Sequence, residues 1–241
     1  MEGTTVMALT ASSVNPATHG NAAAGDLSGR RAAALAGVTS AVLLFLGVFI
    51  LNPPLNASDA ELVDWWSNES NQAAATVSMY LFTAAALSFL GFLTHLCARI
   101  SADERGRQPA QLVLGCGIVF STMLAVAAAA RGVVGKAVAF NDQPLPGADT
   151  LRYLMQTASA ALGVVAMLAA AVAIVAVTYA VLRTGVFGRW LAWLGVIAAV
   201  VLLAVQATFV GELAIPAILI WTVAASAAIW RSPSTIDLAV R

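Results

Sequence analysis

Six apolar runs, each long enough to cross a bilayer, constrain this chain more than any other feature. A spanning helix needs about 20 mainly apolar residues, whereas a strand of a membrane barrel needs only about 10 with strict alternation, which these runs lack. Nearly every charge lies at the edge of a run or outside it. The pattern predicts an all-α, polytopic transmembrane helical bundle with six spans: Ala32 to Leu51, Ala73 to Ala98, Ala110 to Ala130, Tyr153 to Leu182, Trp190 to Val210 and Leu213 to Trp230.

Composition supports a membrane protein and excludes a nucleic-acid binder. Hydrophobic residues make up 60% of the chain and charged residues 10%, against about 25% charged in soluble domains. The formal net charge is zero, and there is no basic face to neutralise phosphates. We therefore expect the lipid bilayer to be the main partner, with no nucleic acid bound.

The ends of the chain are predicted to be cytoplasmic tails, residues 1–31 and 231–241, around a transmembrane domain of residues 32–230. The first tail is rich in Ala, Ser, Thr, Asn and Gly, so we expect it to be disordered. Arg30 and Arg31 precede an apolar run, as in a secretory signal. That run has 20 residues, beyond the 7–15 typical of a cleaved signal core, so a retained span is expected.

The distribution of Lys and Arg predicts that both termini lie in the cytoplasm, in a cytoplasmic (inner) membrane. One side of the six-span topology holds nine of these residues: Arg30, Arg31, Arg99, Arg105, Arg107, Arg183, Arg189, Arg231 and Arg241. The other side holds three: Arg131, Lys136 and Arg152. The first external loop is acidic, in keeping with this orientation.

A short amphipathic helix is predicted in that first external loop. Ser58 and Glu61 have the spacing of a capping box, and Leu62, Trp65 and Trp66 follow at positions that share one helix face. We interpret it as an interfacial helix with its indoles toward the outer leaflet. The alternative is a lid or docking element over the bundle.

Small residues at helical spacing predict close contact between helices. Because lipid supplies little hydrophobic drive between helices, such contacts hold a bundle together. The structural interpretation is favoured; the alternative is that one face forms a homo-oligomer or docks a membrane partner. The faces are Ala33, Gly37 and Ala41; Gly117, Ser121, Ala125 and Ala129; and Ala166, Ala169, Ala173, Ala176 and Ala180.

His95 is the candidate for an inner polar site. It lies about 33 Å along the second run at about 1.5 Å per residue, which places it near the inner boundary and facing the bundle. A proton, metal or haem role was weighed against a hydrogen-bonded histidine at the interface. One histidine cannot form a bis-His site, and Cys97 and Cys116 complete no tetrahedral set with it, so no metal or cofactor is expected.

A possible outer polar vestibule combines Arg131, Lys136, Gln206 and Glu212, which come from the outer ends of the third and fifth runs and the following turn. If those runs pack together, Arg131 and Glu212 can pair, with Gln206 slightly deeper. The functional interpretation is a pocket for a small solute or lipid headgroup. Interfacial snorkelling with a structural ion pair is the favoured alternative.

The order of several segments resembles uncharacterised six-span membrane proteins of bacteria. The segments read LVDWWSNESNQAAA after the first span, THLCARI at the end of the second, and GRWLAWLGVIAAV late in the chain. The resemblance covers roughly residues 30–231. It implies a helical bundle in the cytoplasmic membrane and carries over no activity, cofactor or functional residue.

Catalytic patterns are absent from the sequence: there is no His-Glu-x-x-His helix, Gly-x-Ser-x-Gly turn or phosphate-binding Gly loop. The deep polar groups are mainly hydroxyls, so no enzyme and no catalytic residue is predicted. We expect a non-enzymatic interaction or accessory protein of the membrane. The alternative is a transporter or channel for a small neutral or lipophilic solute, although midplane acidic groups and broken helices in matching halves are missing.

Overall fold

A computed structural model describes residues 16–51, 53–54, 57–207 and 214–232. This part of the chain is helical and contains no strand. In order, the elements are α1 (Pro16–Ile50), α2 (Asp59–Ser67), α3 (Glu69–Ser101), α4 (Glu104–Asn141), α5 (Ala148–Ser159), the π-helix η1 (Ala160–Ala166), α6 (Met167–Thr184), α7 (Arg189–Gln206) and α8 (Ile215–Arg231).

Local sequence signals mark where several of these helices begin and end. The side chains of Asn68 and Asp103 accept hydrogen bonds from the backbone N–H two residues later, which caps the starts of α3 and α4. α4 ends at Asp142, with φ of 49°, and α6 ends at Gly185, with φ of 67°. Glycine adopts this left-handed conformation without steric cost, so Gly185 stops α6 where a turn is needed.

Five helical segments are long and apolar enough to cross a membrane: Leu27–Ile50, Glu69–Ser101, Glu104–Asn141, Ala148–Thr184 and Arg189–Gln206. α8 is a shorter apolar helix of 17 residues. An all-α, multi-span membrane protein is therefore confirmed by length and hydropathy. The predicted turn at Gly211 and Glu212 lies outside the described residues.

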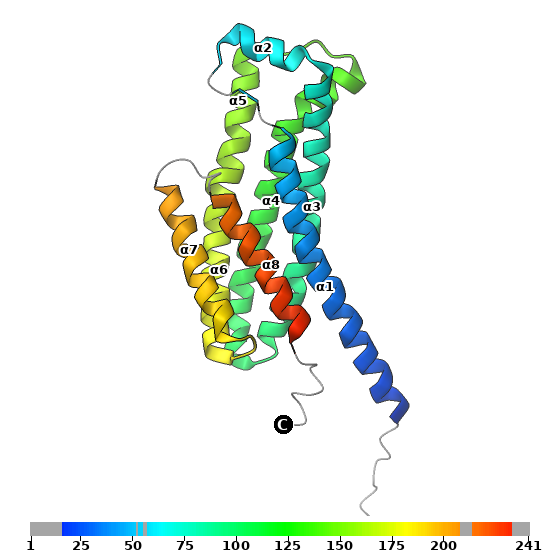
Figure 1. Cartoon of the computed structure of the whole chain (residues 1–241), viewed down its shortest axis with the longest axis vertical. Helices are drawn as coiled ribbons and strands as arrows, with labels where there is room; N and C mark the ends of the chain where they lie inside the picture. Colours follow the sequence, from blue (N-terminus) through cyan, green and yellow to red (C-terminus); the bar gives the residue numbers. More distant parts are fainter. Residues whose placement is uncertain (1–15, 52, 55–56, 208–213, 233–241) are drawn as a thin grey trace, which may run out of the picture.

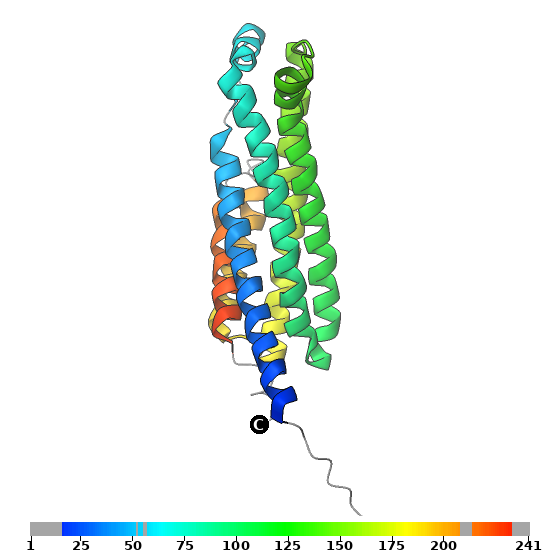
Figure 2. The ribbon, with the colours of Figure 1, turned by 90° about the vertical axis from the view of Figure 1, so that its right-hand side faces the viewer.

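The long helices form a bundle in which α3 and α4 lie side by side along most of their length. α1 packs on α3, α6 packs on α4, and α7 packs on α6. α8 contacts both α7 and α1 and crosses the lower part of the bundle obliquely (Figure 1). Figure 2 shows the same bundle from the side, with α3 and α4 rising to its upper end and the start of α1 extending below them.

The last two helices, α7 and α8, are much shorter than α3 and α4. α7 has 18 residues and α4 has 38, which correspond to about 27 Å and about 57 Å. A hydrocarbon core is about 30 Å thick, so α4 is longer than the core is thick. The upper ends of α3 and α4, with α2 and α5, form the end of the bundle that rises above α7 and α8 (Figure 1); it is called the outer end after the orientation predicted from the Lys and Arg distribution.

Two of the predicted small-residue faces lie inside the bundle. A Cβ atom on Gly37 would lie 2.1 Å from Ser226 Oγ of α8 and 2.7 Å from the Phe92 ring of α3. The face of α6 is likewise covered: Ala166, Ala173, Ala176 and Ala180 are buried and Ala169 is half-buried. These faces therefore join helices within the chain.

Only two of the four residues in the small-residue face predicted on α4 lie inside the bundle. Gly117 and Ser121 are buried, and a Cβ on Gly117 would lie 1.9 Å from Leu93 Cδ2, but Ala125 and Ala129 are exposed. With 3.6 residues per turn, each four-residue step rotates by about 40°. Residues at that spacing therefore turn progressively away from the neighbouring helix, and the last two no longer face it.

α2 confirms the predicted helix and its capping box but not its predicted contact with lipid. Glu61 N–H donates to Ser58 Oγ at 3.4 Å, and Ser58 N–H donates to Glu61 Oε2 at 2.8 Å. Leu62 and Trp66 are buried against Leu51 and residues of α3, α4 and α5. Because the outer ends of those helices rise beneath α2, the apolar surface that it covers is protein.

The first helix begins earlier than the sequence predicts. α1 starts at Pro16, so residues 16–31 of the expected disordered tail are helical. Alanine has the highest helix propensity, and adding residues to an existing helix costs far less than nucleating one. The Ala-rich segment before Arg30 therefore continues the first span, whereas residues 1–15 lie outside the described part.

Candidate functional site

Arg131 lies buried between the outer ends of α1, α3 and α4. Its Nη2 donates to the carbonyl oxygen of Leu51 at 3.1 Å, and its guanidinium carbon lies 5.4 Å from the centre of the Phe82 ring. Leu51 follows the last residue of α1, where carbonyl groups lack partners within the helix and the helix dipole is negative. Arg131 therefore caps α1, joins it to α4 and contacts Phe82 of α3.

The other residues of the predicted vestibule have different surroundings. Lys136 is exposed on α4, and Glu212 lies outside the described residues. Gln206, the last residue of α7, donates from Nε2 to the carbonyl oxygen of Gly163 at 2.5 Å. Arg131 and Gln206 thus bind different elements: Arg131 donates to Leu51 after α1, and Gln206 donates to Gly163 of η1.

The Gln206 bond explains how a π-helix is accommodated inside a long apolar segment. η1 widens the helix at Ala160–Ala166, which changes the backbone bonding pattern in a region where water is scarce. The side-chain amide of Gln206 supplies a donor to one of its carbonyl groups. Gln206 therefore joins α7 to the helix formed by α5, η1 and α6.

His95 is half-buried on α3 and faces α1. Its Cε1 lies 3.9 Å from the position that a Cβ on Gly29 would take, and it lines a shallow hollow with Gly29, Ala32, Ala33, Ala36, Gly91 and Thr94. Over the described ranges, no three His, Cys, Asp or Glu side chains are grouped as a metal site would require. The position of His95 matches a histidine packed at a helix contact.

An outer polar network was not predicted from the sequence. Arg152 of α5 donates to the carbonyl oxygen of Ala57 and to Asp59 Oδ1, both at 2.7 Å. Asn71 and Gln72 of α3 donate to the carbonyl oxygens of Trp65 and Trp66 at 2.8 and 2.9 Å. The acidic first loop and Arg152, one of three basic residues on the same predicted side, were the available signal. Together these bonds fix α2 across the outer end.

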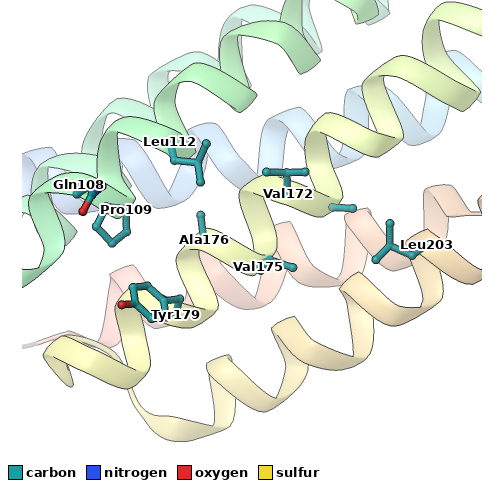
Figure 3. Close-up of a pocket in the computed structure, with 9 residues that line it drawn as sticks. Gln108, Pro109, Leu112, Val172, Val175, Ala176, Tyr179 and Leu203 are labelled. Atoms are coloured by element: carbon teal, nitrogen blue, oxygen red, sulfur yellow. The ribbon is translucent and has the colours of Figure 1, made fainter.

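A lateral apolar groove was also missed. It lies between α4 and α7, has α6 as its floor, and has a volume of about 650 Å³. Figure 3 shows Gln108, Pro109 and Tyr179 at one end of the groove and Leu203 at the other. Because three helices build it, no single run of sequence predicts it.

No known family model, curated protein or solved structure matches the chain. Hydropathy and helix length identify the chain as a multi-span helical membrane protein.

Proposed function

We propose that the protein is a non-enzymatic interaction or accessory protein of the cytoplasmic membrane, which binds a membrane partner through its outer end. In this proposal α8 is the sixth span, since its 17 residues reach the lower limit of about 17 for a spanning helix. The nine-to-three distribution of Lys and Arg supports cytoplasmic termini.

The observation that carries the proposal is the way α2 is fixed over the bundle. Four side-chain bonds from Asn71, Gln72 and Arg152 hold its two ends, and the Trp66 side chain is fully buried beneath it. A rigid surface loses little conformational entropy when a partner binds. Its exposed face carries Asp64 and Glu61, so the expected partner surface is basic.

The close packing within the bundle favours this function over transport. Phe82, Phe92 and Phe120 are fully buried where α1, α3 and α4 meet. An enclosed void between Phe120 and Trp221 has a volume of about 10 Å³, which is room for about one water molecule. Tight side-chain packing at these places is what favours an accessory role over transport.

Purification of the full chain in mild detergent, followed by mass analysis, tests the proposal. We expect a second membrane protein to be recovered in a fixed ratio. The double variant Ala60→Lys, Asp64→Lys reverses the charge of the exposed face of α2 and should release that partner. Glu104→Lys, an exposed change at the other end of the bundle, is the matched control. A lone chain under all conditions would refute an accessory role.

A further inference from the structure

The groove between α4 and α7 has the lining of a lipid-binding site. Its floor contains the small residues Ala171 and Ala176, and its walls include Leu112, Val175 and Leu203, which are 51%, 51% and 50% exposed. An occupant could therefore enter from the side, through the bilayer. A volume of about 650 Å³ falls within the range of about 300–1,000 Å³ found for small-molecule sites.

Apolar side chains line most of the groove, and its polar side chains lie at one end. Gln108 and Tyr179 lie together at that end (Figure 3). One turn beyond Tyr179, the guanidinium of Arg183 lies 4.9 Å from the centre of the Tyr179 ring and remains exposed. Arg105 and Arg107 at the start of α4 add exposed positive charge at the same end of the bundle. This arrangement matches an acyl chain joined to an anionic headgroup.

The length of the groove fits an acyl chain better than another helix. From Tyr179 back to Val172 and Ala171 it follows α6 for about two turns, or roughly 12 Å at about 1.5 Å per residue. A transmembrane helix packed in the groove would need apolar contact over much of the hydrocarbon core, which is about 30 Å thick. With its side chains, that helix would also be about 10–12 Å wide.

We propose that this groove binds one anionic phospholipid of the surrounding bilayer, with an acyl chain along α6 and the phosphate group beside Arg183 and Gln108. Arg183 pairs with the phosphate through its planar guanidinium, which suits bidentate contact with phosphate oxygens. Gln108 donates a further hydrogen bond. The site lies at the opposite end of the bundle from α2 and does not depend on the partner proposed there.

Native mass spectrometry of the full chain tests the proposal, using phosphatidylglycerol and phosphatidylcholine with identical acyl chains. We expect one phosphatidylglycerol per chain to survive detergent exchange, and to be retained about fivefold better than phosphatidylcholine, in line with one favourable cationic contact. Arg183→Gln should remove that preference. Val175→Phe should fill the groove and reduce the retention of both lipids.

Matched variants separate this site from general lipid contact. Arg231→Gln removes another exposed arginine at the end of α8, and Val200→Phe enlarges a side chain on α7 that is 60% exposed and does not line the groove. Both should retain phosphatidylglycerol like the unmodified chain. Thermal unfolding of each variant establishes that the fold is intact.

Three results would overturn the proposal. If the two lipids are retained equally, the headgroup makes no specific contact with the protein. If Arg183→Gln and Arg231→Gln reduce the retention of phosphatidylglycerol equally, positive charge acts generally and not at one site. A lipid-free dimer that Val175→Phe dissociates would assign the groove to a second copy of the chain.

Discussion

The outer end of the molecule and the two short helices α7 and α8, called the hairpin below because they are consecutive and in contact, are held in place by different forces. At the outer end, polar side chains cross between elements: Arg131 to α1, Arg152 to the segment before α2, and Gln72 to the end of α2. In the hairpin, small residues allow close approach. Gly195 of α7 lies so close to α6 that an added Cβ would be 2.1 Å from Thr178 Oγ1.

The difference follows from the surroundings of the two regions. Near water, hydrogen bonds can be formed and exchanged, and they fix the geometry of short elements such as α2. In hydrocarbon, unpaired polar groups are costly, so helices associate mainly through close packing of small side chains. The hairpin also has a polar exception, the bond from Gln206 to Gly163, at the point where the π-helix changes the backbone pattern.

Replacing Arg131 should have the largest effect, and it tests the polar side of the comparison. Arg131→Met removes the bond to the Leu51 carbonyl and the contact with Phe82, so we expect a loss of about 2–3 kcal/mol in the free energy of unfolding. Reversible unfolding in mixed micelles measures it. Lys136→Met is the control, since Lys136 is exposed on the same helix. Similar losses in both variants would contradict a capping role for Arg131.

A methyl group on Gly195 tests the packing side. Gly195→Ala should cost about 2 kcal/mol, because α6 and α7 must separate or Thr178 must move. Adding Thr178→Ala removes the clashing hydroxyl and should restore most of the loss. Gly115→Ala, with no atom within 4 Å of the added Cβ, should be neutral or slightly stabilising. If Gly195→Ala behaves like Gly115→Ala, the hairpin is not held by close approach at this position.

The sequence predicts the membrane-spanning character of the fold well because the bilayer imposes a simple rule. Apolar length alone identifies five segments that can cross it, and the Ser58 and Glu61 spacing predicts the start of α2. Both features depend only on residues close together in the chain. The Gly37 face was also predictable, since a glycine between two alanines at four-residue spacing favours close contact.

What the sequence could not predict depends on the relative heights of the helices. Trp66 was expected to face lipid, but α3, α4 and α5 rise high enough to bury it. The sequence also could not predict the partners of Arg131 and Gln206, which donate to the carbonyl oxygens of Leu51 and Gly163; the vestibule predicted for them also includes Glu212, which lies outside the described residues. Helix packing decides both outcomes, and hydropathy carries no information about it.

Removing the Gln206 side-chain amide should have a moderate effect. It tests how much the one polar bond described for the hairpin contributes. Gln206→Leu deletes the bond to Gly163, so we expect a loss of about 1 kcal/mol and faster hydrogen exchange across residues 160–166. Gln156→Leu is the control, because Gln156 is exposed on α5. Unchanged exchange in the Gln206 variant would mean that the π-helix is maintained without its neighbour.

The smallest expected effect is a pH dependence at the start of α2. Hydrogen bonds from the backbone and hydroxyl of Ser58 lower the pKa of Glu61 below its ordinary value, so folding favours the carboxylate. That contribution is fully present above the unfolded pKa of about 4.3 and is lost as the pH falls through the lower pKa of the folded state.

We therefore expect hydrogen exchange of residues 57–67, corrected for its intrinsic pH dependence, to report less protection toward pH 3. Asp59 also pairs with Arg152, at 2.7 Å, so the comparison must isolate Glu61. Glu61→Gln keeps an acceptor for Ser58 but cannot ionise, and the difference between the two proteins gives the contribution of Glu61. An identical pH profile in the variant would show that Glu61 does not cause the effect. The outer end would then depend on its cross-element bonds more than on the capping box within α2.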